Sequence, residues 1–256
     1  MMENDFLKLR GRVALISGGS RGIGRAVAKR LAELGVDVVV NYRSDKEAAA
    51  EVVAYAEAQG VRAFAVPADV SEVWQAKRLV ADTLQRFQRL DFLICNAGIW
   101  EGAPVEEISE SMWDKTIQVN LRGTWTLCQA AVPVMKQQRF GRIVVVSSTA
   151  GQRGEANYSN YAASKGAQIA FTKSLGAELG QFGINVNAVA PGWVDTDMTS
   201  AALAGEDREA IARGIPVGAI ATADDIARPI VFLCSDWARH ITGEILNVNG
   251  GSVLSR

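Results

Sequence analysis

Short runs of apolar, mostly β-branched residues recur along the chain, separated by longer segments in which apolar residues follow helical spacing. The runs predict strands at Val13–Ser17, Asp37–Asn41, Arg62–Val66, Asp91–Cys95, Arg142–Ser147, Asn185–Ala190 and Glu244–Val248. The intervening segments predict helices, such as Ile23–Leu34, Lys46–Gln59 and Val73–Phe87. This alternation predicts an α/β fold: a Rossmann-type, doubly wound sheet of about seven parallel strands with helices on both faces. Ligands of such a sheet bind beyond the carboxyl ends of its strands.

No linker, repeat or change of composition divides the chain, so we expect a single domain over residues 1–256. The stretch from about 192 to 218 interrupts the regular alternation. It starts with Pro191-Gly192, has Pro216 near its end and shows only a weak helical pattern between. We expect this stretch to be a lid-like insertion over the site.

Composition and charge narrow the class of function. Of 256 residues, 48% are hydrophobic and 21% charged, with a formal net charge of −1. This balance argues against a nucleic-acid or membrane surface, and no apolar run reaches the roughly 18–20 residues of a membrane span. The 3 cysteines lack a CxxC pair and favour free thiols in a reducing compartment. With an N-terminus too polar for a signal peptide, the chain is expected to be cytoplasmic.

The first predicted strand runs into a glycine-rich turn, Ser17–Gly24, of sequence SGGSRGIG, and a helix follows. Glycines permit a tight turn and a close approach of a pyrophosphate, to which the helix N-terminus offers free N–H groups. The spacing G-x-x-x-G-x-G differs from the usual G-x-G-x-x-G fingerprint. The turn also partly matches the P-loop motif, but Arg25 and Ala26 occupy the positions where that motif requires Lys and then Ser or Thr. The turn therefore favours a dinucleotide.

The end of the second strand bears on the choice of cofactor. An NAD site usually has an acidic residue there, about 20 residues after the glycine turn, to bind the ribose 2′-hydroxyl. Here Tyr42, Arg43 and Ser44 occupy the position, and Arg21 lies in the glycine turn. A guanidinium binds a phosphate through two hydrogen bonds. We therefore expect NADP(H) rather than NAD(H).

Tyr161 and Lys165 are spaced i and i+4, so on a helix their side chains project from one face. A tyrosine with a pKa near 10 is too weak a base at neutral pH, and a nearby ammonium lowers that pKa. Tyr161 would then exchange a proton with a substrate oxygen while hydride moves. Tyr158 has Ala162 at i+4 and lacks such a partner.

The sequence resembles the compact short-chain dehydrogenases/reductases along essentially its whole length. The resemblance is carried by motifs in matching order and spacing: Gly18-x3-Gly22-x-Gly24, Asp69-Val70, Asn96-Ala97-Gly98, Asn120, Ser148, Tyr161-x3-Lys165 and Pro191-Gly192. Within the family the similarity is greatest to the 3-oxoacyl-(acyl-carrier-protein) reductases. Two departures are Ser17, which replaces the usual Thr, and Cys95, which replaces an Asn and is expected to cost that turn a hydrogen bond.

The resemblance implies four catalytic residues. Ser148 would bind the substrate oxygen, with Ser147 as the competing candidate on the opposite face of the strand. Asn120 would sit in a locally distorted helix and hold a water in a proton relay through Lys165, and Tyr161 would be the acid–base group. The cofactor contacts that the glycine turn, the second strand and the resemblance imply are Gly18, Ser20, Arg21, Gly22, Ile23, Gly24, Tyr42, Arg43, Ser44, Asp69, Val70, Asn96, Ala97, Gly98, Tyr161, Lys165, Pro191, Gly192, Val194 and Thr196.

Beside Ser148, four residues fall in segments expected to border the substrate: Trp100, Gln152, Arg153 and Trp193. Two indoles would give an apolar wall suited to a bulky or acyl-like carbonyl, although each indole equally fits packing against the lid or a neighbouring subunit. His240 is the single histidine, so no metal site is expected.

These features predict an NADP(H)-dependent oxidoreductase acting on a carbonyl or alcohol, with a 3-oxoacyl thioester as first choice. A general carbonyl, ketone or sugar-alcohol oxidoreductase is the alternative. A non-catalytic NADP(H) sensor would be expected to lack the Tyr–Lys pair, and an epimerase or dehydratase would need a further substrate domain. An acyl carrier protein is a possible partner, with Arg139 and Arg142 as candidate basic contacts, although Ala177 replaces a frequent basic residue. The resemblance also implies a homotetramer built on helices near Ser111–Gln137 and Tyr158–Gln181 and on the strand near Ile245–Val248.

Overall fold

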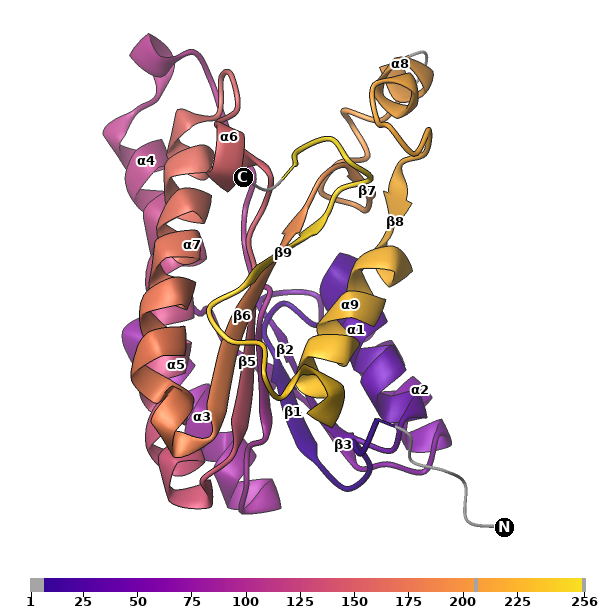
Figure 1. Ribbon diagram of the computed structural model, residues 1–256, viewed down its shortest axis with the longest axis vertical. Helices are drawn as coiled ribbons and strands as arrows, with labels where there is room; N and C mark the ends of the chain where they lie inside the picture. Colours follow the sequence, from indigo (N-terminus) through magenta and orange to yellow (C-terminus); the bar gives the residue numbers. More distant parts are fainter. Residues whose placement is uncertain (1–6, 205–206, 255–256) are drawn as a thin grey trace.

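The computed structural model describes residues 7–204 and 207–254, so part of the polar N-terminus lies outside the described residues. Within them one seven-stranded parallel sheet has the order β3-β2-β1-β4-β5-β6-β9 (Figure 1). Its strands are β1 (Val13–Ile16), β2 (Asp37–Tyr42), β3 (Ala63–Pro67), β4 (Phe92–Cys95), β5 (Gly141–Val146), β6 (Ile184–Pro191) and β9 (Ile245–Val248). The doubly wound fold is confirmed, and every predicted strand end lies within one residue of the observed end.

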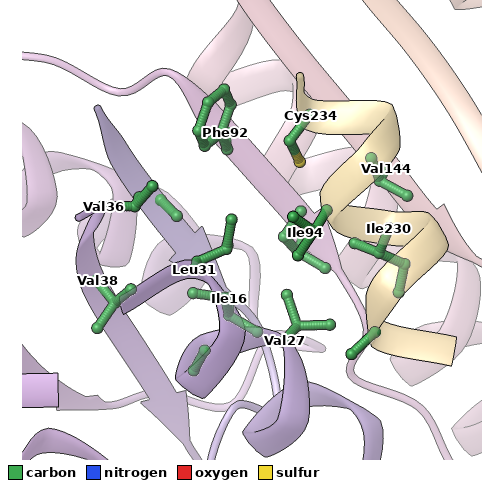
Figure 2. Close-up of a cluster of buried hydrophobic side chains, with 14 of the residues drawn as sticks. Ile16, Val27, Leu31, Val36, Val38, Phe92, Ile94, Val144, Ile230 and Cys234 are labelled. Atoms are coloured by element: carbon green, nitrogen blue, oxygen red, sulfur yellow. The ribbon is translucent and has the colours of Figure 1, made fainter. Parts of the chain in front are cut away.

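Helices cover both faces of the sheet. On one face lie α1 (Gly22–Glu33), α2 (Lys46–Ala58) and α9 (Ala223–Cys234); on the other lie α3 (Val73–Phe87), α5 (Gly123–Gln138) and α7 (Ser159–Leu179) (Figure 1). Each strand alternates its side chains between the two layers, so β4 sends Ile94 toward α1 and α9 and Leu93 toward α3 and α5. Figure 2 shows the first layer, where Val27 and Leu31 of α1 meet Ile230 of α9 above the sheet.

The order of the strands reverses between β1 and β4. β1 pairs with β2 on one side and with β4 on the other, so the chain segments that follow β1 and β4 diverge to opposite faces. A crevice forms at such a switch point, beyond the carboxyl ends of the two strands. The topology therefore places the glycine turn after β1 beside the Asn96 turn after β4.

Smaller elements surround this end of the sheet. The helix predicted near Ser111–Gln137 is interrupted: α4 (Glu110–Thr116) runs through a π-helical turn (Ile117–Arg122) into α5, and α6 (Ala150–Arg153) precedes α7. Between β6 and α9 the chain forms a short parallel pair, β7 (Val194–Asp195) with β8 (Ala221–Thr222), and α8 (Asp207–Arg213). β7 and α8 lie in the segment expected to be a lid, at about 192–218, and β8 follows it; the lid itself stays a prediction.

Candidate active site

A cavity of about 560 Å³ lies at the carboxyl ends of the strands. Segments that follow five strands of the sheet converge on it. They contribute Gly18 after β1, Arg43 after β2, Ala68 after β3, Asn96 after β4 and Ser148 after β5. The segment expected to be a lid closes one side with Met198, Ile211 and Ile215. The cavity thus occupies the place where an open parallel sheet binds its ligands.

The glycine turn and the Asn96 turn are bonded directly to one another. Asn96 Nδ2 donates to the main-chain oxygens of Ser17 and Gly18, both at 3.0 Å. The hydroxyl of Ser17 accepts from the main-chain N–H groups of Asn96 and Ala97, at 3.0 and 3.1 Å. Cys95 points away, into the core beside Cys128. Cys95 therefore does not leave the turn loose, because Ser17 and Asn96 supply the bonds that hold it.

Gly24 packs against the back of the glycine turn and does not line the cavity. A Cβ at Gly24 would lie 2.3 Å from the oxygen of Gly18 and 2.6 Å from Asn96 Nδ2. The first turn of α1 can therefore press against the loop only because residue 24 has no side chain. Gly22, at φ 52°, takes a left-handed conformation and packs against Thr196 of the lid segment.

Most residues expected to contact a cofactor do line the cavity. They are Gly18, Ser20, Arg21, Gly22, Ile23, Tyr42, Arg43, Ser44, Asp69, Val70, Asn96, Ala97, Gly98, Tyr161, Lys165, Pro191, Gly192, Val194 and Thr196. The nearby carboxylates are already engaged: Asp45 caps α2 by accepting from Ala48 N at 2.9 Å, and Asp69 accepts from the N–H and hydroxyl of Ser71. Arg21 and Arg43 line the same end of the cavity and form no ion pair among the described contacts, so both guanidinium groups are available to an anionic ligand.

Ser148, Tyr161 and Lys165 meet in the middle of the cavity. Tyr161 and Lys165 lie one turn apart on α7, with Lys165 Nζ 5.6 Å from the centre of the Tyr161 ring. Tyr161 shares a hydrogen bond with Ser148, and Lys165 Nζ donates to the oxygen of Val146 at 2.8 Å. Ser147 points away and donates from its hydroxyl to the oxygen of Lys165 at 2.9 Å, which is a structural role.

Burial governs the proton affinities of this pair. It raises the pKa of Tyr161 to about 12, although the Ser148 hydrogen bond opposes the rise, and it lowers the pKa of Lys165 to about 7. The expectation that the lysine lowers the pKa of the tyrosine is therefore wrong for the chain by itself. Removing water from both groups disfavours both charged forms, and this cost exceeds the attraction between them.

Asn120 lies in the π-helical turn, as the predicted local distortion requires, and it is fully buried behind the cavity. Its side chain bonds the main chain of Ile99 in both directions, at 2.8 and 3.0 Å, and donates to Ser164 Oγ at 3.0 Å. Its main-chain oxygen accepts from Thr124 Oγ1 at 2.8 Å and from Gln168 Nε2 at 2.7 Å. Both the oxygen and the nitrogen of the Asn120 side chain are therefore hydrogen-bonded within the protein.

Aromatic side chains form a wall at the substrate end of the cavity. The rings of Trp100 and Tyr158 stack at 4.7 Å and 11°, and Trp193 meets Trp100 edge-on at 5.8 Å and 90°. Trp100, Arg153 and Trp193 line the cavity as expected. Gln152 does not: it is exposed, and its Nε2 donates to Asn247 Oδ1 at 2.7 Å, so its placement in the substrate pocket was wrong.

Three polar residues that the sequence analysis left out matter here. Asn41 accepts from the N–H of Gly18 at 3.1 Å and donates to Ala68 O at 3.0 Å, which ties the glycine turn to β2 and β3. Glu155 lines the substrate end, and Gln168 bonds the π-helical turn. An amide within the apolar run of β2 was a signal for Asn41; the other two carry no local pattern.

The candidate basic contacts for a carrier protein are misplaced within the single chain. Arg139 and Arg142 lie at the amino end of β5, whereas the cavity lies beyond its carboxyl end. Arg142 is also 5% exposed and donates to the oxygens of Gly141 and Gly183. Its buried position opposes a docking role at the mouth.

Within residues 7–204 and 207–254, no group of three or more His, Cys, Asp or Glu side chains is arranged to hold a metal ion. His240 is exposed. No helix in this part of the chain has the length and hydropathy needed to cross a membrane.

Comparison with known proteins defines the class. Residues 18–253 match the family model described as enoyl-(acyl carrier protein) reductase. A 3-oxoacyl-(acyl-carrier-protein) reductase FabG of Staphylococcus aureus is 42% identical over 241 residues, which are 94% of this chain and 98% of that protein. The FabG of Aquifex aeolicus is 38% identical over 245 residues, 96% of this chain and 98% of that one.

A solved structure agrees. A short chain dehydrogenase from Burkholderia cenocepacia in complex with NADP is similar with a TM-score of 0.90 at 38% identity, covering 96% of this chain and 99% of that chain. The chain belongs to the short-chain dehydrogenase/reductase family. It is accordingly an oxidoreductase, and Ser148, Tyr161 and Lys165, three of the four residues that the family resemblance marked for catalysis, line its cavity.

Proposed function

We propose that this chain is an NADP(H)-dependent reductase that acts on the keto group of a 3-oxoacyl thioester. One observation carries the proposal: Ser148, Tyr161 and Lys165 share a single cavity with the glycine turn at the switch point of the sheet. The relatives named 3-oxoacyl-(acyl-carrier-protein) reductase support the substrate class. The similar structure in complex with NADP supports the cofactor.

The residues present fit a dinucleotide carrying a 2′-phosphate. The glycine turn leaves no room for a Cβ at Gly24 and presents the N-terminus of α1, which suits a pyrophosphate. Arg21 and Arg43 line the cavity near the end of β2 and would bind the 2′-phosphate, with Ser44 as a further donor. Gly98 leaves space beside Lys165 Nζ, which would bind ribose hydroxyls. When bound, the nicotinamide supplies the hydride.

Side chains of the protein would supply the proton that the substrate oxygen takes up. Ser148, placed by β5, would donate a hydrogen bond to the keto oxygen and hold it toward Tyr161. The raised pKa of Tyr161 keeps its hydroxyl protonated, so Tyr161 can give that proton to the oxygen as negative charge develops. Lys165 lies one helical turn from the tyrosine, where its ammonium form would stabilise the phenolate that Tyr161 leaves after giving up its proton.

The aromatic wall and the apolar lid residues favour an acyl chain over a sugar. Trp100 and Trp193 line the same cavity as Met198, Ile211 and Ile215 of the lid segment. A general carbonyl or ketone oxidoreductase remains the second candidate, because Arg153 and Glu155 add polar groups to the same end. We also place the protein in the cytoplasm, which its three buried free thiols support.

The test is a substrate screen that follows oxidation of NADPH and of NADH. Acetoacetyl thioesters of coenzyme A and of acyl carrier protein would be compared with crotonyl thioesters, aldehydes, cyclic ketones and sugar lactones. We expect the highest kcat/KM for an acetoacetyl thioester with NADPH. A preference for NADH, or for crotonyl thioesters or sugars, would refute the corresponding part of the proposal.

A further inference from the structure

Glu155 is a half-buried acid at the substrate end of the cavity, six residues before Tyr161. It follows α6 directly, after Gly154, which takes a φ of 79° that a residue with a side chain rarely adopts. Its main-chain oxygen accepts from the N–H of Tyr158 at 3.1 Å, so a turn fixes the segment just before α7 begins. The backbone therefore holds the Glu155 side chain against the cavity.

The surroundings of this carboxyl group are mostly aromatic. The indole N–H of Trp100 donates to it, and the same indole is held between Tyr158 and Trp193. Burial raises the pKa of Glu155, while the Trp100 hydrogen bond and the nearby charge of Arg153 oppose the rise. A carboxylate has about four lone-pair sites, so one indole bond leaves acceptor capacity for a second donor.

Among the described residues, three other carboxylates line the cavity. Asp45 caps α2 and Asp69 bonds Ser71, while Asp197 belongs to the lid segment. Glu155 differs from them in its contact with the aromatic wall, through the Trp100 N–H, and its negative charge raises the pKa of Tyr161. The Glu155 carboxylate and the Tyr161 hydroxyl therefore line the same cavity, into which a substrate carbonyl would have to enter.

We propose that Glu155 is a specificity-determining residue, which accepts a hydrogen bond from a hydroxyl or amine beside the substrate carbonyl and rejects substrates with a carboxylate there. The inference rests on the proposed carbonyl reduction and adds a substrate class to it. A half-buried carboxylate with acceptor capacity beyond its Trp100 bond is matched better by a substrate donor than by an apolar group, and a second negative charge beside it is disfavoured more strongly still. In a 3-oxoacyl thioester the thioester oxygen carries no hydrogen to donate, so Glu155 would not form a hydrogen bond with it.

The test compares three small ketones of similar size: 1-hydroxybutan-2-one, pentan-2-one and 2-oxobutanoate. Values of kcat/KM with NADPH would be measured for the wild-type chain and for Glu155→Gln. The amide keeps the volume and an oxygen for the Trp100 N–H but loses the charge. Glu106→Gln, an exposed acid outside the cavity, is the matched control.

We expect the wild type to prefer the hydroxyketone over pentan-2-one by about 10- to 100-fold, the range of a hydrogen bond to a charged group. In Glu155→Gln this ratio falls at least tenfold and 2-oxobutanoate gains, whereas Glu106→Gln behaves as wild type. Equal ratios in wild type and Glu155→Gln would overturn the role of Glu155 while leaving the reductase intact.

A second measurement separates this result from failure of the proposed function. Binding of the same ketones to the complex with NADP⁺ would be ranked by saturation-transfer NMR for both variants. A chain that reduces no carbonyl compound but still loses its hydroxyketone preference on Glu155→Gln would refute the reductase and keep the recognition site. Equal binding of all three ketones to both variants would overturn the proposed recognition site.

Discussion

At the scale of single residues, two tyrosines three positions apart have different surroundings. Tyr161 is bonded to Ser148 in the cavity, whereas the Tyr158 ring stacks on Trp100. We predict that Tyr161→Phe lowers kcat by about 10²- to 10⁴-fold, the usual contribution of a general acid. Binding of NADPH, followed by its fluorescence, should persist. Tyr158→Phe keeps the stacked ring and is the control, expected within a few-fold of wild type; full activity of Tyr161→Phe would refute the assignment.

Lys165 gives a second prediction at this scale, on stability against pH. Its pKa is about 7 in the folded chain because of burial, and about 10.4 in an unfolded chain. Between these values the unfolded state binds the extra proton, so the free energy of unfolding that Lys165 contributes rises with pH. We expect the stability advantage of Lys165→Met over wild type to shrink by up to about 1.4 kcal/mol per pH unit from pH 7 to 10.

Urea unfolding at several pH values measures this difference, and other titrating groups cancel because both variants share them. Lys173→Met, on an exposed position of the same helix, is the control for removing a lysine. A constant difference between Lys165→Met and wild type across this range would show that the lysine is not buried as a neutral amine. Such a result would also contradict a lowered pKa for the Lys165 ammonium group next to Tyr161.

At the scale of elements, the π-helical turn is held by a residue from another helix. Gln168 of α7 donates to the oxygen of Asn120, and its own Oε1 has no partner within the described part of the chain. Gln168→Leu should cost about 1–3 kcal/mol of stability, because it removes two buried hydrogen bonds, to Asn120 O and to Thr124 Oγ1. It should also lower kcat, because Asn120 packs against Gly98 beside Lys165.

Thr172→Val is the control for this prediction. Thr172 lies one turn further along α7, is fully buried and donates to the oxygen of Gln168 at 2.8 Å, without reaching the π-helical turn. We expect both variants to unfold more easily in urea and only Gln168→Leu to lose kcat and shift its pH profile. Equal kcat values in the two variants would make Gln168 a purely structural residue.

The elements also mark what the sequence could and could not predict. Strands such as β5, buried on both faces, were located to within one residue, because a continuous apolar run has few other placements. Tyr161, Lys165 and Ser148 came from a family motif and did meet. Gln152 was misplaced because position along the chain does not tell which way a side chain faces, and Arg142 because it lies buried at the end of β5 away from the cavity. Tyr161's raised pKa depends on burial from distant segments, which no local pattern contains.

At the scale of the whole molecule, α4, α5 and α7 lie together on one side of the sheet (Figure 1). Some apolar side chains of this layer are exposed in the single chain. Trp113 on α4 is 42% exposed and Trp125 on α5 is 41% exposed, and Ala163 and Ala170 of α7 are exposed as well. Isolated apolar residues on a surface are ordinary, but a layer that gathers several is typical of an interface. We propose that this layer pairs with a second copy in a homotetramer.

Sedimentation velocity tests this assembly with a matched pair of substitutions. Ala170→Glu places a charge in the proposed interface, where burying it without a partner is costly, and should shift a tetramer to smaller species. Ala54→Glu makes the same change on an exposed position of α2, in the opposite helix layer, and should leave the tetramer unchanged. A wild-type chain that sediments as a monomer would refute the tetramer. Dissociation by Ala54→Glu alone would move the interface to the α1, α2 and α9 face. Because α7 also carries Tyr161 and Lys165, loss of kcat together with dissociation in Ala170→Glu would connect assembly to the geometry of the site.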